Sequence, residues 1–246
     1  MIVSNVSDVE KLQALGDVAR GVLNSCLDLV VPGASGTVLS EAAEEMFVRA
    51  GVEAAPPLAA GFPAPICVSV NSCVAHGVPD DTPFEEGDTV NVDVSVTKEG
   101  LWVDTGLTTF AGSASDTNYA LQQVTVLART AMIHAAQDGV SLYDIADTCQ
   151  RIASRYGYQI IRNYGGHGTG DALHTEPFIS NYPPEATEGH LSAGQVIAIE
   201  PILSLSSING HPVEGSEWGI HTDTQSAQAE HTIIVPESGN RPIFVT

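Results

Sequence analysis

Two aspartates, Asp93 and Asp104, lie in one stretch that reads as a β-hairpin, residues 89–110. Four valines between positions 90 and 96 alternate with polar residues, which is typical of a strand with one apolar face, so Asp93 points to the opposite face. A tight turn at Lys98 and Glu99 pairs positions that sum to 197, which places Asp93 directly across from Asp104. Like charges opposed in this way destabilise a sheet. The pair therefore needs a physical reason.

Three arrangements account for two opposed carboxylates. They share a proton, they hold a cation between them, or both lie at the solvated rim of the sheet. The hairpin alone favours the solvated rim. A slip of one residue in register would also separate the two onto opposite faces.

Other side chains of metal-ligand type stand among small or apolar neighbours. His167 lies within a glycine-rich segment, residues 163–170, where glycines permit close backbone approach. Glu200 ends a buried apolar run, and an acid in such a run needs a partner. Glu230 precedes another apolar strand, while His76 and His174 stand in apolar or glycine-flanked settings.

Each of these residues alone is more often a loop histidine or a rim carboxylate than a ligand. The remaining histidines fit that ordinary description: His134, His190, His211, His221 and His231. Taken together, two hairpin aspartates, two strand glutamates and one histidine form an oxygen and nitrogen set without thiolate. Such a set suits a pair of hard-to-borderline divalent cations.

The elements that must position these residues follow from hydrophobic periodicity and capping signals. We expect two helices, from a capping box at Ser7 to Leu27 and from 39 to 50, then an irregular Pro/Gly/Ala-rich loop at 54–65. A strand at 66–71 and the hairpin follow. Two more helices, 116–138 and 142–157, precede strands at 158–162, 195–203, 218–222, 230–235 and 242–245. Two similar helix-plus-antiparallel-sheet halves indicate an α+β fold.

Composition narrows the class of protein. The 246 residues contain 9 Lys+Arg against 30 Asp+Glu, a net charge of −21, which argues against nucleic acid or an anionic membrane as partner. No apolar run approaches the roughly 18 residues of a bilayer span. The four cysteines form no C-x-x-C pair, and the first residues carry no basic-then-apolar signal. These features favour a cytoplasmic protein.

A family resemblance rests on motifs between residues 71 and 232. They are Asn71-Ser-Cys-Val-Ala-His76-Gly-Val-Pro79, Val90-Asn-Val-Asp93, Asp104-Thr105, Gly166-His167-Gly168, His174-x-Glu176-Pro177, Ile199-Glu200-Pro201 and Ser226-Ala-Gln-x-Glu230-His-Thr. In this order they resemble the methionine aminopeptidases. The interval of 26 positions from His174 to Glu200 resembles that of type I, since type II carries a long helical insertion there. The resemblance implies one catalytic pita-bread domain over 1–246, with pseudo-symmetric halves of about 1–110 and 111–246 around a dinuclear metal site.

The resemblance also implies roles. Asp93 matches the chelating ligand of one metal, Asp104 and Glu230 the bridging carboxylates, and His167 and Glu200 the remaining ligands. The metals would be two divalent ions, Co, Mn, Fe or Zn, that activate water for attack on the peptide bond. Glu200 matches a proton shuttle. His76 and His174 match histidines that contact substrate and stabilise the tetrahedral intermediate.

The side-chain pocket departs from the family pattern. Phe62, Cys67 and Trp218 fit it, whereas Pro56, Ala59 and Leu173 stand where bulkier or different residues are common. Asp171 and Thr175 replace a common arginine and a common glutamate.

The function implied is removal of initiator methionine from nascent proteins and peptides by a monomer. Two alternatives stay open: a diverged peptidase with altered first-residue or Xaa-Pro specificity, and a non-catalytic pita-bread binding protein.

Overall fold

The computed structural model describes residues 1–186, 188–212 and 217–246. Its helices are α1 (Val6–Asp28), α2 (Gly36–Ala50), α3 (Ala55–Ala60), α4 (Asp116–Ala135) and α5 (Leu142–Tyr156), with a 3-10 turn at Pro183–Glu185. The strands of the first half are β1 (Glu53–Ala54), β2 (Cys67–Val70), β3 (Cys73–Ala75), β4 (Thr89–Lys98) and β5 (Leu101–Phe110). Those of the second half are β6 (Gln159–Ile160), β7 (Gly165–Gly168), β8 (Thr175–Ser180), β9 (Val196–Ile199), β10 (Ile202–Ser204), β11 (His211–Pro212), β12 (Ile220–His221), β13 (Ser226–Gln228), β14 (His231–Ile234) and β15 (Ile243–Phe244).

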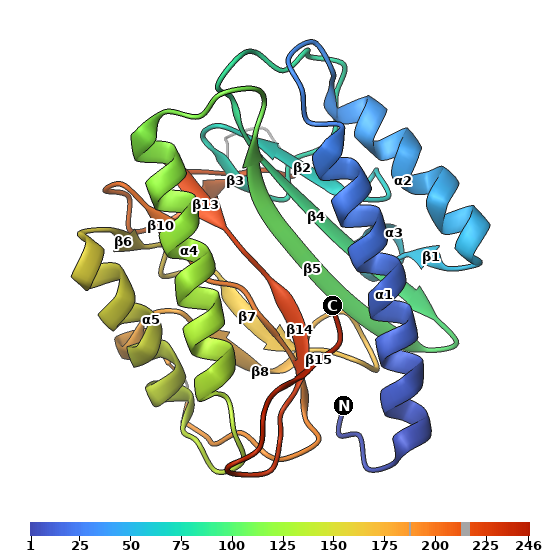
Figure 1. The fold of residues 1–246 in the computed structure, drawn as a ribbon, viewed down its shortest axis with the longest axis vertical. Coiled ribbons are helices and arrows are strands. Elements are labelled where there is room, and N and C mark those ends of the chain that lie inside the picture. Colours follow the sequence, from blue (N-terminus) through green and yellow to red (C-terminus); the bar gives the residue numbers. More distant parts are fainter. Residues whose placement is uncertain (187, 213–216) are drawn as a thin grey trace.

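Two helix pairs flank a central set of strands. Helix α1 covers β4 and β5 on one side, with α2 packed beside it. On the other side α4 covers β10 and β13, and α5 contacts α4 and β8 (Figure 1). Every strand pairing that the structure describes is antiparallel. One hydrophobic core lies mainly under α1 and α2 and another under α4 and α5. The predicted α+β class with two helix-plus-sheet halves is therefore confirmed.

The halves are joined along β5. The backbone N–H of Glu230 donates to the carbonyl of Gly106 at 2.8 Å. The N–H of Asp104 donates to Oγ1 of Thr232 at 3.0 Å, and that hydroxyl donates back to the Asp104 carbonyl at 2.8 Å. Residues more than a hundred positions apart are thus held side by side, with Asp104 and Glu230 on the seam.

The predicted hairpin exists, but its register is wrong by two residues. Asp93 pairs with Gly106 and Asp104 with Ser95. The turn residues are Glu99 and Gly100, both with positive φ, because the favoured two-residue hairpin turn needs that conformation at both positions. A slip of two keeps every side chain on its face, so the aspartates remain diagonal neighbours on one face.

Three further expectations need correction. The capping box at Ser7 is wrong, because the side chain of Asn5 accepts from the N–H of Asp8 and α1 begins at Val6. The segment 54–65 contains helix α3, with proline in its first turn and left-handed Gly61 at its end. The strand expected at 195–203 is broken into β9 and β10 at Glu200-Pro201, where proline has no N–H for a ladder.

The glycine-rich segment around His167, for which the sequence predicted no strand, contains strand β7 between β8 and β9. A Cβ on Gly166 would lie 2.2 Å from the carbonyl oxygen of Ala198, and one on Gly168 would lie 2.3 Å from that of Glu176. Glycine is required here because neighbouring backbones approach closely on both sides.

Helix α1 is held to the hairpin by its apolar face, so we expect Leu12→Ala to lower the free energy of unfolding by about 2–5 kcal/mol. Leu12 is fully buried in the first core. Val48→Ala, on an exposed position of α2, should change it by less than about 0.5 kcal/mol. Urea denaturation followed by circular dichroism measures both. Equal effects would contradict the described packing of α1.

Candidate active site

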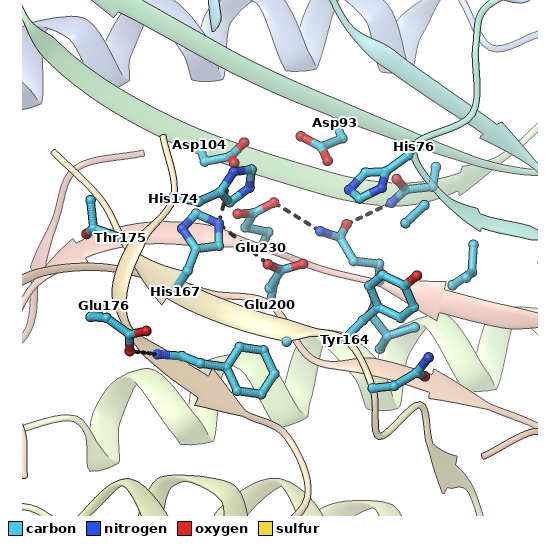
Figure 2. Close-up of a pocket in the computed structure, with 18 residues that line it drawn as sticks. His76, Asp93, Asp104, Tyr164, His167, His174, Thr175, Glu176, Glu200 and Glu230 are labelled. Atoms are coloured by element: carbon cyan, nitrogen blue, oxygen red, sulfur yellow. Dashed lines mark hydrogen bonds and ion pairs between the residues drawn. The ribbon is translucent and has the colours of Figure 1, made fainter. Parts of the chain in front are cut away.

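A cavity of about 550 Å³ lies between the two halves and contains the acids predicted from the sequence. Asp93 comes from β4 and Asp104 from β5, while His167 comes from β7. Glu200 lies at the break between β9 and β10, and Glu230 lies between β13 and β14. Figure 2 shows the four carboxylates and the His167 ring converging from opposite sides.

These five side chains form overlapping groups that fit cations. Ligand atoms of Asp93, Asp104 and Glu230 lie within 4.8 Å of one another, as do those of His167, Glu200 and Glu230. Nε2 of His167 lies 3.6 Å from Glu200 and 3.8 Å from Asp104. A third group combines Asp104, His167 and His174.

Burial and crowding make these acids costly without a cation. Burial raises the pKa of Asp93, Glu200 and Glu230 well above the usual value, and the nearby charge of Asp104 raises each further. Burial lowers the pKa of His167 to about 4, so its ring is neutral near pH 7 and able to bind a metal.

Two buried carboxylate oxygens indicate whether a metal fits the site. Among the described residues, Oδ1 of Asp93 and Oε1 of Glu230 have no hydrogen-bond partner. Buried polar atoms normally have one, and a buried charge is paired or bound to metal. Ser95 Oγ donates to Oδ1 of Asp104 at 2.7 Å, so one oxygen of that carboxylate already has a hydrogen-bond partner. The donor set and its unmet oxygens therefore fit divalent cations.

His76 and His174 lie at the border of the same cavity. His76 has a positive φ of 53°, and the following Gly77 sits so close to β2 that a Cβ would lie 2.3 Å from the Val68 carbonyl oxygen. Burial lowers the pKa of His76, with a smaller contribution from His174. The ring of His174 is exposed and lies 4.4 Å, centroid to centroid, from that of His167.

A smaller pocket of about 90 Å³ opens beside Asp93 and Asp104. Phe62, Cys67 and Trp218 line it as expected, with the Phe62 and Trp218 rings edge to face at 5.1 Å. Pro56 and Leu173 line it as well, but Ala60 does so in place of the expected Ala59, which is exposed. Thr175 lines the large cavity, while Asp171 lies outside and meets the Met1 ammonium at 3.3 Å.

Asn91, Ser95 and Gln228 contribute to the site without having been singled out from sequence. All three are buried polar residues near the acids. The two-residue periodicity of a strand could have indicated them. Residues 91, 93 and 95 share one face of β4, and residue 228 is two positions from Glu230.

The helices of the described residues include none long and apolar enough to span a membrane.

Comparisons with known proteins agree with this geometry. The model of metallopeptidase family M24 matches residues 10–237. The chain is 32% identical over 234 residues to methionine aminopeptidase 1D, chloroplastic/mitochondrial, of Arabidopsis thaliana, covering 94% of this chain and 66% of that protein. It therefore spans slightly under two thirds of that relative. It is also 32% identical over 251 residues to the methionine aminopeptidase of Staphylococcus epidermidis, covering 100% of this chain and 98% of that protein.

Solved structures give the same result. The crystal structure of methionine aminopeptidase from Thermotoga maritima superposes with a TM-score of 0.94 at 31% identity, covering 100% of this chain and 99% of that one. The prolidase from Pyrococcus horikoshii shares the fold, with a TM-score of 0.78 at 20% identity over 63% of its chain. With this fold, this acid-rich cavity and a family match over nearly its whole length, the chain belongs to metallopeptidase family M24, a family of metal-dependent hydrolases with the pita-bread fold.

Proposed function

We propose that this chain is an aminopeptidase that removes methionine from the N-termini of proteins and peptides. The main observation behind the proposal is that the small pocket and the large cavity adjoin. The small apolar pocket and the large acid-lined cavity share His76, Asp93, Asp104 and His174 as lining residues. A terminal side chain in the small pocket would therefore place its own amine and peptide bond beside the acids.

We propose Asp93, Asp104, His167, Glu200 and Glu230 as the ligands of two divalent cations. Asp93 would chelate one cation, Asp104 and Glu230 would bridge, and His167 and Glu200 would complete the second site. Bound divalent cations supply a nucleophile at neutral pH by lowering the pKa of water. The clustering of these five residues supports the assignment, because Asp104, His167 and Glu230 each belong to two of the groups and so link all five into one connected set.

The remaining roles belong to residues at the border of the cavity. His76 and His174 would donate hydrogen bonds to the substrate and to the oxyanion that develops during attack. Glu200 would take a proton from water and deliver it to the leaving amine, since its carboxylate lies beside the proposed cation site and burial raises its pKa.

The small pocket would select the first side chain. Its walls are mostly apolar, and its volume of about 90 Å³ favours a slender, unbranched group over an aromatic one. Phe62, Cys67 and Trp218 form part of its wall, together with Asp93 and His76. Leu173 and Ala60 leave the rest lined by aliphatic groups.

We expect Phe62→Ala to lower kcat/KM for a methionine-leading peptide by about 10–100-fold, because the lost apolar contact is worth about 1.4–2.8 kcal/mol. Phe62 is buried and holds the Trp218 ring edge to face. Steady-state kinetics measure the effect. Leu58→Ala, on an exposed position of helix α3, which precedes Phe62, is the control. Unchanged selectivity between methionine and leucine in Phe62→Ala would argue against this pocket.

We further propose that the whole chain acts as one catalytic unit, with halves of about 1–110 and 111–246, and that it works as a cytoplasmic monomer on nascent protein N-termini. Its net charge of −21 supports the expectation that nucleic acid and membranes are not partners.

The deciding experiment is hydrolysis of Met-Ala-Ser against Leu-, Ala- and Xaa-Pro-leading analogues, with Mn or Co added and with EDTA. We expect metal-dependent release of methionine, much slower release from the others and no release in EDTA. Preference for Xaa-Pro or for another first residue would keep the hydrolytic site and overturn the substrate. Stoichiometric metal binding without any release would indicate a binding protein.

A further inference from the structure

A buried chain of amides connects β4 to Glu230 and has no assigned role. Asn91 Nδ2 donates to Oε1 of Gln228 at 2.8 Å, and Gln228 Nε2 donates to Oε2 of Glu230 at 3.0 Å. These three residues and the neighbouring Thr108 are almost inaccessible to solvent: Asn91 is 6% exposed, Gln228 3%, Thr108 1% and Glu230 1%. Figure 2 shows this chain of dashed contacts running to Glu230 beside the converging acids.

The geometry leaves Gln228 one orientation. Asn91 uses both of its N–H groups as donors, one to Gln228 and the other to Oγ1 of Thr108 at 3.3 Å. The same Thr108 hydroxyl accepts the backbone N–H of Gln228 at 2.9 Å. Since the amide oxygen of Gln228 faces the Asn91 donor, its NH₂ group must face Glu230.

Space is also reserved for this side chain. A Cβ on Gly106 would lie 2.7 Å from Oε1 and 3.1 Å from Nε2 of Gln228. Gly106 stands opposite Asp93 in the hairpin and accepts the backbone N–H of Glu230. Glycine at this position therefore lets the Gln228 amide approach β5 closely, while the carbonyl of the same residue accepts the backbone N–H of Glu230.

The consequence falls on the two oxygens of Glu230. Oε2 is occupied by the Gln228 donor, whereas Oε1 has no partner among the described residues. Outer hydrogen bonds of this kind orient a ligating carboxylate and set its affinity for metal. We propose that Asn91 and Gln228 are positioning residues that hold Glu230 with Oε1 directed to the cation site. This inference rests on the proposed function, because it assumes that Glu230 is a metal ligand.

The test is a double-mutant cycle read out by metal affinity. Gln228→Met keeps the side-chain volume and removes the donor, and Asn91→Leu removes the group that orients Gln228 without touching Glu230. Isothermal titration with Mn²⁺ should show each single variant weakened roughly 10–100-fold. The double variant should be no weaker than Gln228→Met alone, because both changes act through the Gln228 amide.

Two readouts separate positioning from a merely structural role. The metal-free melting temperatures measure separately the stability lost when buried polar groups lose their partners. The visible spectrum of the Co²⁺-loaded Gln228→Met protein should change because the ligand geometry at Glu230 changes, which a purely structural loss would not produce. Gln122→Met is the matched control, since its amide also donates to this region, through the Thr108 carbonyl at 3.1 Å, but does not contact Glu230.

Each outcome decides the proposal. Mn²⁺ affinity of Gln228→Met within twofold of the parent, or additive losses in the double variant, would overturn it. The parent is titrated and assayed first, so that failure of the metal site can be distinguished from failure of the positioning role. A parent that binds no Mn²⁺ overturns both the metal site and the positioning role, whereas a parent that binds and hydrolyses beside unaffected variants overturns the positioning role alone.

Discussion

Asp104→Asn is expected to lower kcat for Met-Ala-Ser by on the order of 10³-fold or more, because stabilisation by metal is worth several kcal/mol and each 1.36 kcal/mol is tenfold. Asp104 belongs to two of the clustered ligand groups, and its charge helps to raise the pKa of Asp93, Glu200 and Glu230. Removing its charge therefore removes a shared ligand. His167→Ala should have an equal effect, since His167 also belongs to two groups.

The same substitutions separate loss of chemistry from loss of fold. Metal-free Asp104→Asn should be at least as stable as the metal-free parent, because one charge leaves a crowded set of buried acids while the Ser95 contact can persist. Kinetics, Mn²⁺ titration and thermal melting measure the three quantities. Glu44→Ala, an exposed acid on α2, is the control for loss of a carboxylate elsewhere. Retained turnover in His167→Ala would sink the assignment of the metal site.

The hairpin shows what local sequence could supply. Alternation placed Asn91, Asp93 and Ser95 on the face opposite the valines, and the structure agrees. The turn was displaced by one residue, so the pairing moved by two and the facing relationship survived. The prediction that the two aspartates face each other directly was wrong, since Ser95 rather than Asp93 stands opposite Asp104.

The burial of the polar face of β4 could not be read locally. Alternation alone favours a solvated face, yet Asn91 and Ser95 are buried. They are covered because the second half of the chain, through Gln228 and Glu230, packs against β4 and β5. This is a contact across more than a hundred residues, which no window of periodicity contains. The resemblance to known peptidases, carried by motifs from both halves, supplied that missing information.

The glycine-rich strand β7, for which the sequence predicted no strand, also depends on contacts between distant residues. Gly165, Gly166 and Gly168 lower the strand propensity of the segment and suggest an irregular chain. Their real reason is tertiary, since β8 and β9 approach too closely for a Cβ at each of these positions. The strand that carries His167 is therefore identifiable only once its neighbours are placed.

Removing metal should make stability fall with rising pH, the second large effect that we expect. Burial and mutual repulsion raise the folded-state pKa of Asp93, Glu200 and Glu230 above the unfolded values of about 4. The folded state then binds more protons than the unfolded state between those two pKa values. The stability these groups contribute is complete below about pH 4 and is lost as pH rises through the folded pKa values.

The histidines act in the opposite sense and over a different range. Burial lowers the pKa of His167 to about 4 and that of His231 to about 3. Their stabilising effect is complete above the unfolded histidine pKa of about 6.5 and is lost only as pH falls below it. A decline in stability between about pH 6.5 and 8 therefore reports the buried carboxylates and not the histidines.

Bound metal should reverse this decline, because cations bind the deprotonated ligands and their binding strengthens as pH rises. Free metal at a hundred times its Kd adds about 2.7 kcal/mol of stability. The gap in melting temperature between Mn²⁺-loaded and EDTA-treated protein should consequently widen from pH 6.5 to 8. Thermal melting by circular dichroism at three pH values measures it, with metal-free Asp104→Asn expected to show a shallower decline. A flat metal-free curve would mean that the acids are already ionised below pH 6.5, and that their crowding is relieved without a cation.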